Sequence, residues 1–128
     1  MLGGYFCKIL DIDLSRGNVG FYETDEELFL TYLGGKGLAA RILYDIVPKG
    51  TSAFSPKNAV IFTTGPLTGT NAPCSSRFNI TTKSPLTGCI ASSNCGGNFA
   101  LKLRSAGYDG LIVRGRARHP VYIDIDEN

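Results

Sequence analysis

Apolar and polar positions alternate near the start of the chain. In residues 6–14 most even positions are apolar and two odd positions are acidic: Phe6, Leu10, Ile12 and Leu14 against Asp11 and Asp13. This period of two is typical of a β-strand. Residues 15–18 supply turn chemistry and residues 19–22 continue in an extended pattern, so we expect a β-hairpin.

Helical spacing follows the hairpin. Thr24 stands three residues before Glu27, which is the spacing of a capping box and predicts a helix start at this point. Glycines in residues 34–37 interrupt the apolar stripe, which then resumes and ends before Pro48. The pattern therefore predicts two short helices joined at a glycine hinge.

The second half of the chain is mainly extended in pattern. Strand patterns occur in five segments: residues 59–62, 78–82, 89–92, 111–113 and 121–125. A stripe of Phe99, Leu103 and Ala106, closed by Gly107, predicts one more helix. The order of these elements shows no βαβ alternation. It predicts a β-dominant α+β fold with two small β-sheets and about three short helices.

Composition narrows the class of protein. The 128 residues suit a single domain, and the 43% hydrophobic and 19% charged fractions are those of a globular chain. Thirteen basic and eleven acidic residues leave a formal charge of +2, far from the basic surface of a nucleic-acid binder. No run approaches the roughly 18 apolar residues of a membrane span, and the first residues lack a signal pattern. We expect a cytoplasmic protein that binds neither nucleic acid nor membrane.

Cysteine and histidine residues do not form a metal-binding pattern. The four cysteines contain no Cys-x-x-Cys pair: Cys7, Cys74, Cys89 and Cys95. We therefore expect free thiols that are buried or half-buried, and no zinc or iron–sulfur ligation by this chain. His119 is the single histidine, with no second one to share a metal or a triad, and is expected at the surface.

A glycine-rich segment and one arginine are candidates for ligand binding. Residues 94–97, Asn-Cys-Gly-Gly, lie between a predicted strand and a predicted helix. Free N–H groups at such a helix start can hold a phosphate, but a plain tight turn with Asn94 as N-cap has the same pattern. Arg77 precedes a strand, where its planar guanidinium suits a cofactor or a carboxylate in a salt bridge. The residues alone favour the tight turn for residues 94–97 and the salt bridge for Arg77 over ligand binding.

Several separated motifs resemble one protein family. They occupy the loop at residues 65–70, residues 77–79 and 82–88, residues 94–97 and residues 106–110. Their order and spacing resemble the amino-terminal domain of the aldehyde:ferredoxin oxidoreductases. The similarity extends over essentially the whole chain.

The resemblance implies a β-rich domain that supports a tungsten or molybdenum bis-pterin cofactor. It implies that Arg77 donates to this cofactor and that Asn94 and Gly96 support its phosphate and magnesium end. It also implies that residues 1–128 are a single pterin-binding N-terminal domain within a longer enzyme. The 4Fe-4S cluster and the proton-transfer residues would then belong to later domains, so no catalytic or metal-ligating residue is expected in this chain.

For the full-length enzyme, the resemblance implies oxidation of an aldehyde to a carboxylate, with electrons passing through the cluster to ferredoxin. We expect the isolated chain to be inactive and without cofactor. We also expect it to self-associate through the face that otherwise meets the cofactor and the remaining domains. The alternative function is a non-catalytic module that keeps the fold and uses its glycine loops for anion binding or assembly.

Overall fold

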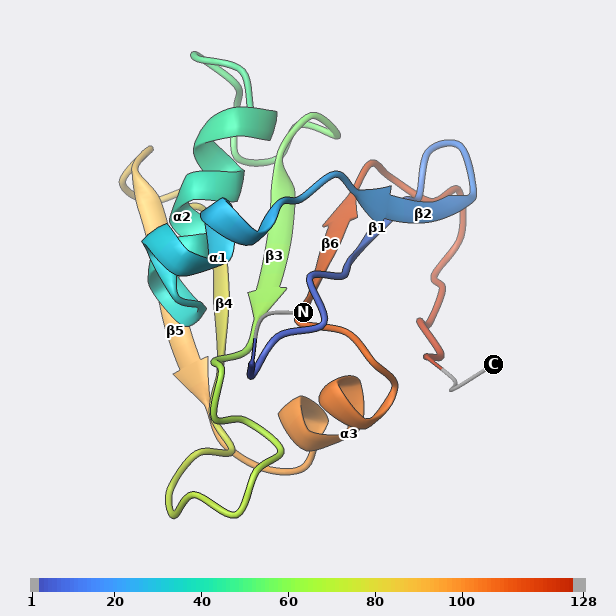
Figure 1. Cartoon of the computed structure of the whole chain (residues 1–128). Coiled ribbons are helices and arrows are strands. Elements are labelled where there is room, and N and C mark those ends of the chain that lie inside the picture. Colours follow the sequence, from blue (N-terminus) through green and yellow to red (C-terminus); the bar gives the residue numbers. More distant parts are fainter. Residues whose placement is uncertain (1–2, 126–128) are drawn as a thin grey trace.

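The computed structural model of this chain describes residues 3–125, which contain six strands and three helices (Figure 1). The strands are β1 (Ile9–Asp13), β2 (Asn18–Tyr22), β3 (Ala59–Thr63), β4 (Phe78–Lys83), β5 (Ile90–Cys95) and β6 (Gly110–Arg114). The helices are α1 (Glu26–Tyr32), α2 (Gly35–Ile46) and α3 (Phe99–Ser105). The strands form one mixed sheet in the order β2-β1-β6-β3-β4-β5, in which β1 and β6 are parallel and all other neighbours are antiparallel.

The α+β class, the three helices and the two hairpins are confirmed, but the expectation of two small sheets is corrected. Strand β6 pairs with β1 on one edge and with β3 on the other, so it joins the N-terminal hairpin to the remaining strands. The last predicted strand is also wrong. Residues 121–125 pair with no strand in the described chain, and Ile125 instead packs its side chain against Leu10, Ile12 and Leu111.

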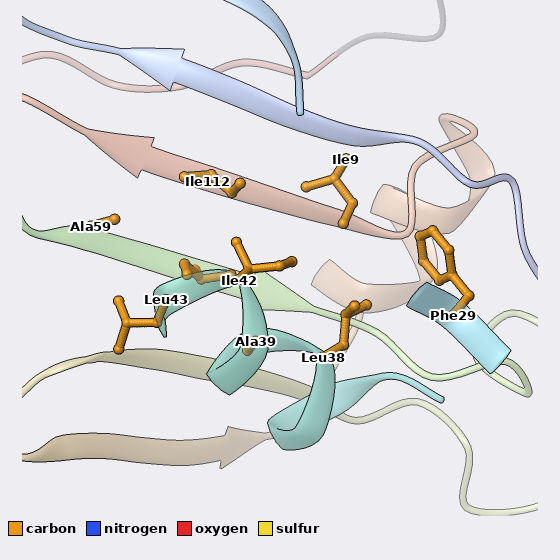
Figure 2. Close-up of a cluster of buried hydrophobic side chains, with 9 residues drawn as sticks. Ile9, Phe29, Leu38, Ala39, Ile42, Leu43, Ala59 and Ile112 are labelled. Atoms are coloured by element: carbon orange, nitrogen blue, oxygen red, sulfur yellow. The ribbon is translucent and has the colours of Figure 1, made fainter. Parts of the chain in front are cut away.

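One face of the sheet is covered by α1 and α2 (Figure 1). Helix α2 buries the apolar stripe that its helical spacing predicts: Leu38, Ala39, Ile42 and Leu43. Ile9 of β1 and Ile112 of β6 lie opposite this stripe and are fully buried (Figure 2). Complete burial of each such side chain contributes about 1.5–3 kcal/mol, so this contact fixes α2 against the centre of the sheet.

The opposite face carries an aromatic cluster under α3. Phe99 of α3 lies with its ring centroid 4.9 Å from Phe78 of β4 and 5.8 Å from Phe62 of β3. These pairs are tilted by 54°, a favourable arrangement for aromatic rings. The cluster holds α3 near the end of β3 and the start of β4.

The start of α1 does not have the predicted N-cap. Asp25, not Thr24, is the N-cap of α1, and its carboxylate accepts a hydrogen bond from the backbone N–H of Leu28 at 2.8 Å. The Thr24 hydroxyl instead donates to the carbonyl of Cys7 at 2.9 Å. The helix therefore begins one residue later than the Thr24–Glu27 spacing predicts, and Thr24 bonds the N-terminal segment instead.

The break between α1 and α2 brings helix α2 close to β3. Gly34 has a φ of 148°, and a Cβ atom at this position would lie 2.5 Å from the carbonyl oxygen of Thr64. The next residue, Gly35, donates its N–H to that same oxygen at 2.9 Å. The expected glycine hinge is therefore confirmed, and it lets the start of α2 meet the end of β3.

Candidate functional site

A cleft of about 400 Å³ lies where β3 ends and β4 begins. Its walls come from the start of α2, the end of β3, the loop between β3 and β4, and the facing residues of β4 and β5. Arg77 and Asn94, which are far apart in sequence, both line it. The structure therefore brings together two of the three residues that the sequence analysis proposed for cofactor binding.

Arg77 lies at this cleft with an exposed side chain. Its guanidinium forms no ion pair or side-chain hydrogen bond with any residue between positions 3 and 125. The alternative role, a salt bridge to a carboxylate, is thus not realised within the described chain. The planar set of N–H donors is available to an anionic ligand.

Asn94 does not lie where the sequence pattern placed it. Strand β5 continues through Asn94 to Cys95, and α3 begins only at Phe99. The interpretations of Asn94 as an N-cap and as the start of a helix are both wrong, because pairing with β4 extends the strand over this residue. The N-cap of α3 is Asn98, whose side chain makes no capping hydrogen bond.

Gly96 follows directly after β5 and is exposed. It is not among the residues that line the cleft. A Cβ atom built at this position would meet no heavy atom within 4 Å, so its backbone is open to an approaching group. The structure therefore does not bring Gly96 into the cleft with Arg77 and Asn94.

Asn79 is a cleft residue that the pattern analysis did not single out. Its side chain is 1% exposed, and its Nδ2 donates to Asn94 Oδ1 at 2.8 Å and to Ser92 Oγ at 2.8 Å. Its Oδ1 accepts from the Thr81 hydroxyl at 2.6 Å. A buried amide with both polar atoms bonded is a rigid support. The signal in the sequence is the polar pair at positions 79 and 81, which share one face of β4.

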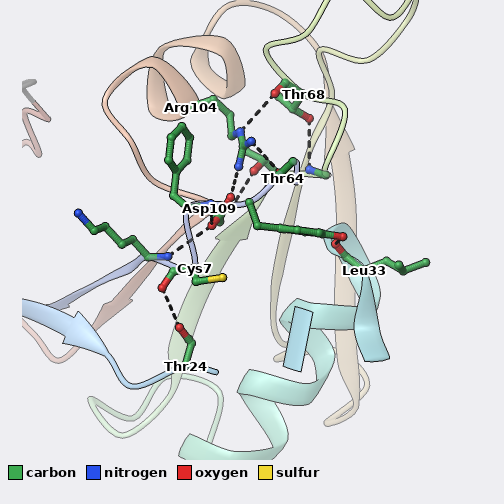
Figure 3. Close-up of polar contacts among 12 residues, drawn as sticks. Cys7, Thr24, Leu33, Thr64, Thr68, Arg104 and Asp109 are labelled. Atoms are coloured by element: carbon green, nitrogen blue, oxygen red, sulfur yellow. Dashed lines mark hydrogen bonds and ion pairs between the residues drawn. The ribbon is translucent and has the colours of Figure 1, made fainter. Parts of the chain in front are cut away.

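Arg104 and Asp109 are a second group that sequence reasoning missed. They form an ion pair with side chains only 9% and 3% exposed, next to the loop that lines the cleft (Figure 3). Burial lowers the pKa of Arg104 from its ordinary value, and nearby Tyr5 opposes this change. An arginine nevertheless remains charged in proteins. An arginine in a predicted helix is ordinarily expected to face solvent. The sequence pattern therefore did not indicate that Arg104 is buried.

The remaining candidate groups are the four cysteines and the single histidine. The four cysteines are free thiols, but only Cys7 is half-buried as expected, and the exposure of Cys74, Cys89 and Cys95 corrects that expectation. His119 is exposed, as expected. No group of three or more His, Cys, Asp or Glu side chains in the described part of the chain is arranged to hold a metal ion. None of the helices described is long and apolar enough to cross a bilayer.

Sequence comparison identifies a matching family. The family model described as "Aldehyde ferredoxin oxidoreductase, N-terminal domain" matches residues 9–128. A tungsten-containing aldehyde ferredoxin oxidoreductase of Pyrococcus horikoshii is 48% identical over 126 residues, which cover 98% of this chain and 21% of that protein. The Pyrococcus furiosus protein of the same name is 44% identical over 124 residues, covering 97% of this chain and 20% of the relative.

More distant relatives share the same region. An aliphatic sulfonate oxidoreductase, WOR-like subunit, of Pyrococcus furiosus is 36% identical over 124 residues. Among solved structures, a chain of the active site complex BamBC of benzoyl coenzyme A reductase, in complex with 1,5-dienoyl-CoA, superposes with a TM-score of 0.95 and 39% identity. That match covers 99% of this chain and 19% of the other. The present chain therefore spans about a fifth of the length of the proteins that it matches.

Proposed function

Because the chain belongs to the aldehyde ferredoxin oxidoreductase N-terminal domain family, we propose that residues 1–128 support the metal cofactor of a longer oxidoreductase. The observation that carries this proposal is the cleft that gathers Arg77 and Asn94. Since the chain matches about a fifth of its relatives, the remaining domains of the same enzyme would complete the site.

The residues of the cleft fit an anionic cofactor. Two donor groups, the Arg77 guanidinium and the Asn94 side-chain amide, line the cleft, and neither donates to another described residue. Charge-assisted hydrogen bonds from such groups are the usual means of holding phosphate. The names of the relatives include tungsten, and the family resemblance extends this to tungsten or molybdenum held by two pterins, with magnesium at their phosphates.

Each residue would have a positioning task toward this cofactor. Arg77 would donate hydrogen bonds to it, and Asn94 would support its phosphate end in the orientation that Asn79 imposes. Gly96 would offer open backbone at the magnesium end, since no side chain blocks its approach. The metal–pterin centre would supply the two-electron oxidation chemistry when bound.

For the complete enzyme we propose oxidation of an aldehyde to a carboxylate, with electrons passing through a 4Fe-4S cluster to ferredoxin in the cytoplasm. The support is that four relatives of 42–48% identity carry the aldehyde ferredoxin oxidoreductase name. The isolated chain would be inactive without the later domains. An exposed apolar side chain on the cleft face, such as that of Leu67, would favour its self-association.

The test uses the full-length protein, purified without oxygen. Elemental analysis and an assay of aldehyde-dependent ferredoxin reduction are the two measurements. We expect stoichiometric tungsten or molybdenum together with activity toward at least one aldehyde. A full-length protein with neither metal would contradict the proposal and would favour the non-catalytic anion-binding or assembly module. Metal without aldehyde oxidation would retain the cofactor-supporting role and contradict only the substrate class.

A further inference from the structure

Arg104 on α3 is bonded to three separate segments of the chain (Figure 3). Its Nη1 pairs with the carboxylate of Asp109, just before β6. Its Nη2 donates to the carbonyl of Gly4 in the N-terminal segment at 2.8 Å. Its Nε donates at 3.2 Å to the carbonyl of Thr68, which belongs to the loop of residues 64–68 that lines the cleft (the cleft loop). One buried guanidinium therefore joins the helix, the N-terminal segment and the loop.

The cleft loop is attached to this ion pair at both ends. Thr64 donates to the carbonyl of Asp109 through its N–H at 3.0 Å and through its hydroxyl at 2.9 Å. At the other end, Thr68 accepts from Arg104, and its hydroxyl accepts from the N–H of Gly65 at 3.2 Å. Residues 64–68 all line the cleft, whereas Arg104 itself does not. The ion pair therefore fixes the wall of the cleft from behind.

The N-terminal segment belongs to the same assembly. The second carboxylate oxygen of Asp109 accepts from the N–H of Phe6 at 2.9 Å, and the Phe6 ring lies 4.6 Å from the guanidinium carbon of Arg104. A Cβ atom on Gly4 would lie 3.0 Å from the carbonyl oxygen of Pro66. Cys7 has a φ of 54°, which interrupts the extended backbone, and β1 begins at Ile9 rather than at Phe6, where the alternating pattern starts.

A buried ion pair is a weak source of stability, because apolar side chains of similar volume stabilise a core at least as well. What this ion pair adds is a defined geometry for the segments that it joins. A planar fork with three differently placed acceptors specifies one arrangement of the segments that it joins. The segment thus fixed is the loop that lines the cleft.

We propose that Arg104 is a positioning residue for the cofactor site. Together with Asp109 it locks residues 64–68 against the N-terminal segment, and so holds the cleft in the shape that receives the anionic groups of the cofactor. This inference rests on the proposed cofactor-supporting function. It also makes the N-terminal segment part of the site's support, because both are bonded to the same guanidinium.

The test compares matched arginine-to-lysine changes in the full-length enzyme. Arg104→Lys keeps the charge opposite Asp109 but cannot reach all three acceptors. Arg114→Lys is the control, since Arg114 also bonds an aspartate, Asp11, at 2.8 and 2.9 Å. Arg114 pairs with Ala59, the first residue of β3, and so lies at the opposite end of that strand from the cleft. The measurements are amide hydrogen exchange of residues 64–70 and of β6, and tungsten or molybdenum per protein.

For Arg104→Lys we expect exchange of residues 64–70 to become about tenfold faster while β6 is unchanged, as for local opening. We also expect metal content to fall well below that of Arg114→Lys. Unchanged loop exchange, or faster exchange in the loop and β6 alike, would overturn the proposal. A faster loop with normal metal content would overturn the positioning role while leaving the proposed function intact. A wild-type enzyme without either metal would instead overturn the proposed function, and with it the cofactor role of Arg104.

Gly69→Ala provides a second variant should Arg104→Lys fail to fold. Gly69 is exposed with a φ of +82°, and an added Cβ would lie 3.3 Å from the Cβ of Arg104. The change strains the loop backbone and brings the added methyl against the aliphatic part of Arg104, while both groups of the ion pair are retained. We expect faster exchange confined to the loop, with loss of metal. Normal exchange and normal metal content together would count against the proposal.

Discussion

The side-chain amide of Asn79 donates a hydrogen bond of 2.8 Å to Oδ1 of Asn94, across the pairing of β4 with β5. This bond fixes which polar atom of Asn94 remains available to the cleft. Because Oδ1 is engaged, the Asn94 amide N–H groups are the ones left to meet a ligand. The orientation of an exposed cleft residue is therefore set by a buried one.

We predict that Asn79→Ala destabilises the chain by about 1–3 kcal/mol, because the variant leaves buried partners such as the Thr81 hydroxyl without their hydrogen bond. The measurement is the free energy of unfolding in urea. Asn98→Ala is the control, since the Asn98 side chain is exposed and makes no capping bond. It should change stability by less than about 0.5 kcal/mol. Equal effects of the two changes would contradict the supporting role of Asn79.

We predict that Asp25→Ala costs about 1 kcal/mol, the usual loss for an N-cap. Glu27→Ala, which would matter if the capping box of the sequence pattern were formed, should cost less than about 0.5 kcal/mol. The free energy of unfolding in urea, measured for both variants, decides between the Asp25 N-cap and the predicted capping box with Glu27. A larger loss for Glu27→Ala than for Asp25→Ala would be incompatible with the observed N-cap.

We predict that stability falls with rising pH through the Cys7 thiol. Burial, and then the negative charge of Glu26, raise the pKa of Cys7 above its ordinary value of 9.0. The folded chain therefore binds this proton more tightly than the unfolded chain does. The contribution is complete below the ordinary pKa and is lost as pH rises toward the raised one. Urea unfolding at two pH values on either side of 9.0 should show a smaller decrease for Cys7→Ala than for the natural chain. Parallel decreases would exclude this role for the thiol.

Local patterns predicted those parts of the fold whose partners are close in sequence. The first hairpin follows from alternation in β1 and a turn, and α2 follows from a regular stripe that ends before Pro48. The joining of both halves into one sheet could not be predicted in this way. It depends on β6 lying parallel to β1, with Ile9 opposite Gly110, and periodicity does not specify a partner so distant in the chain.

In the candidate site too, local patterns predict some features, whereas contacts between distant residues determine the others. The residue type of Arg77 and its place before a strand favour a salt bridge, and only the family resemblance points to a cofactor. The glycines after Asn94 predict a helix start at that residue. Pairing with β4 overrode that local signal. Arg104 was missed because its partners Gly4 and Thr68 are distant in sequence. Only the three-dimensional arrangement reveals that a charged helix residue is buried.

The metal content of the full-length Arg77→Met variant tests the central claim most directly. Arg16→Met is the matched control, since the Arg16 side chain is 77% exposed and follows the end of β1 away from the cleft. A guanidinium that bonds a charged cofactor contributes about 1.5–3 kcal/mol, or roughly ten- to over a hundredfold in affinity. We therefore predict that Arg77→Met loses most of its tungsten or molybdenum with an unchanged thermal midpoint, while Arg16→Met retains both. Normal metal content in the Arg77 variant would contradict the assignment of this cleft to the cofactor.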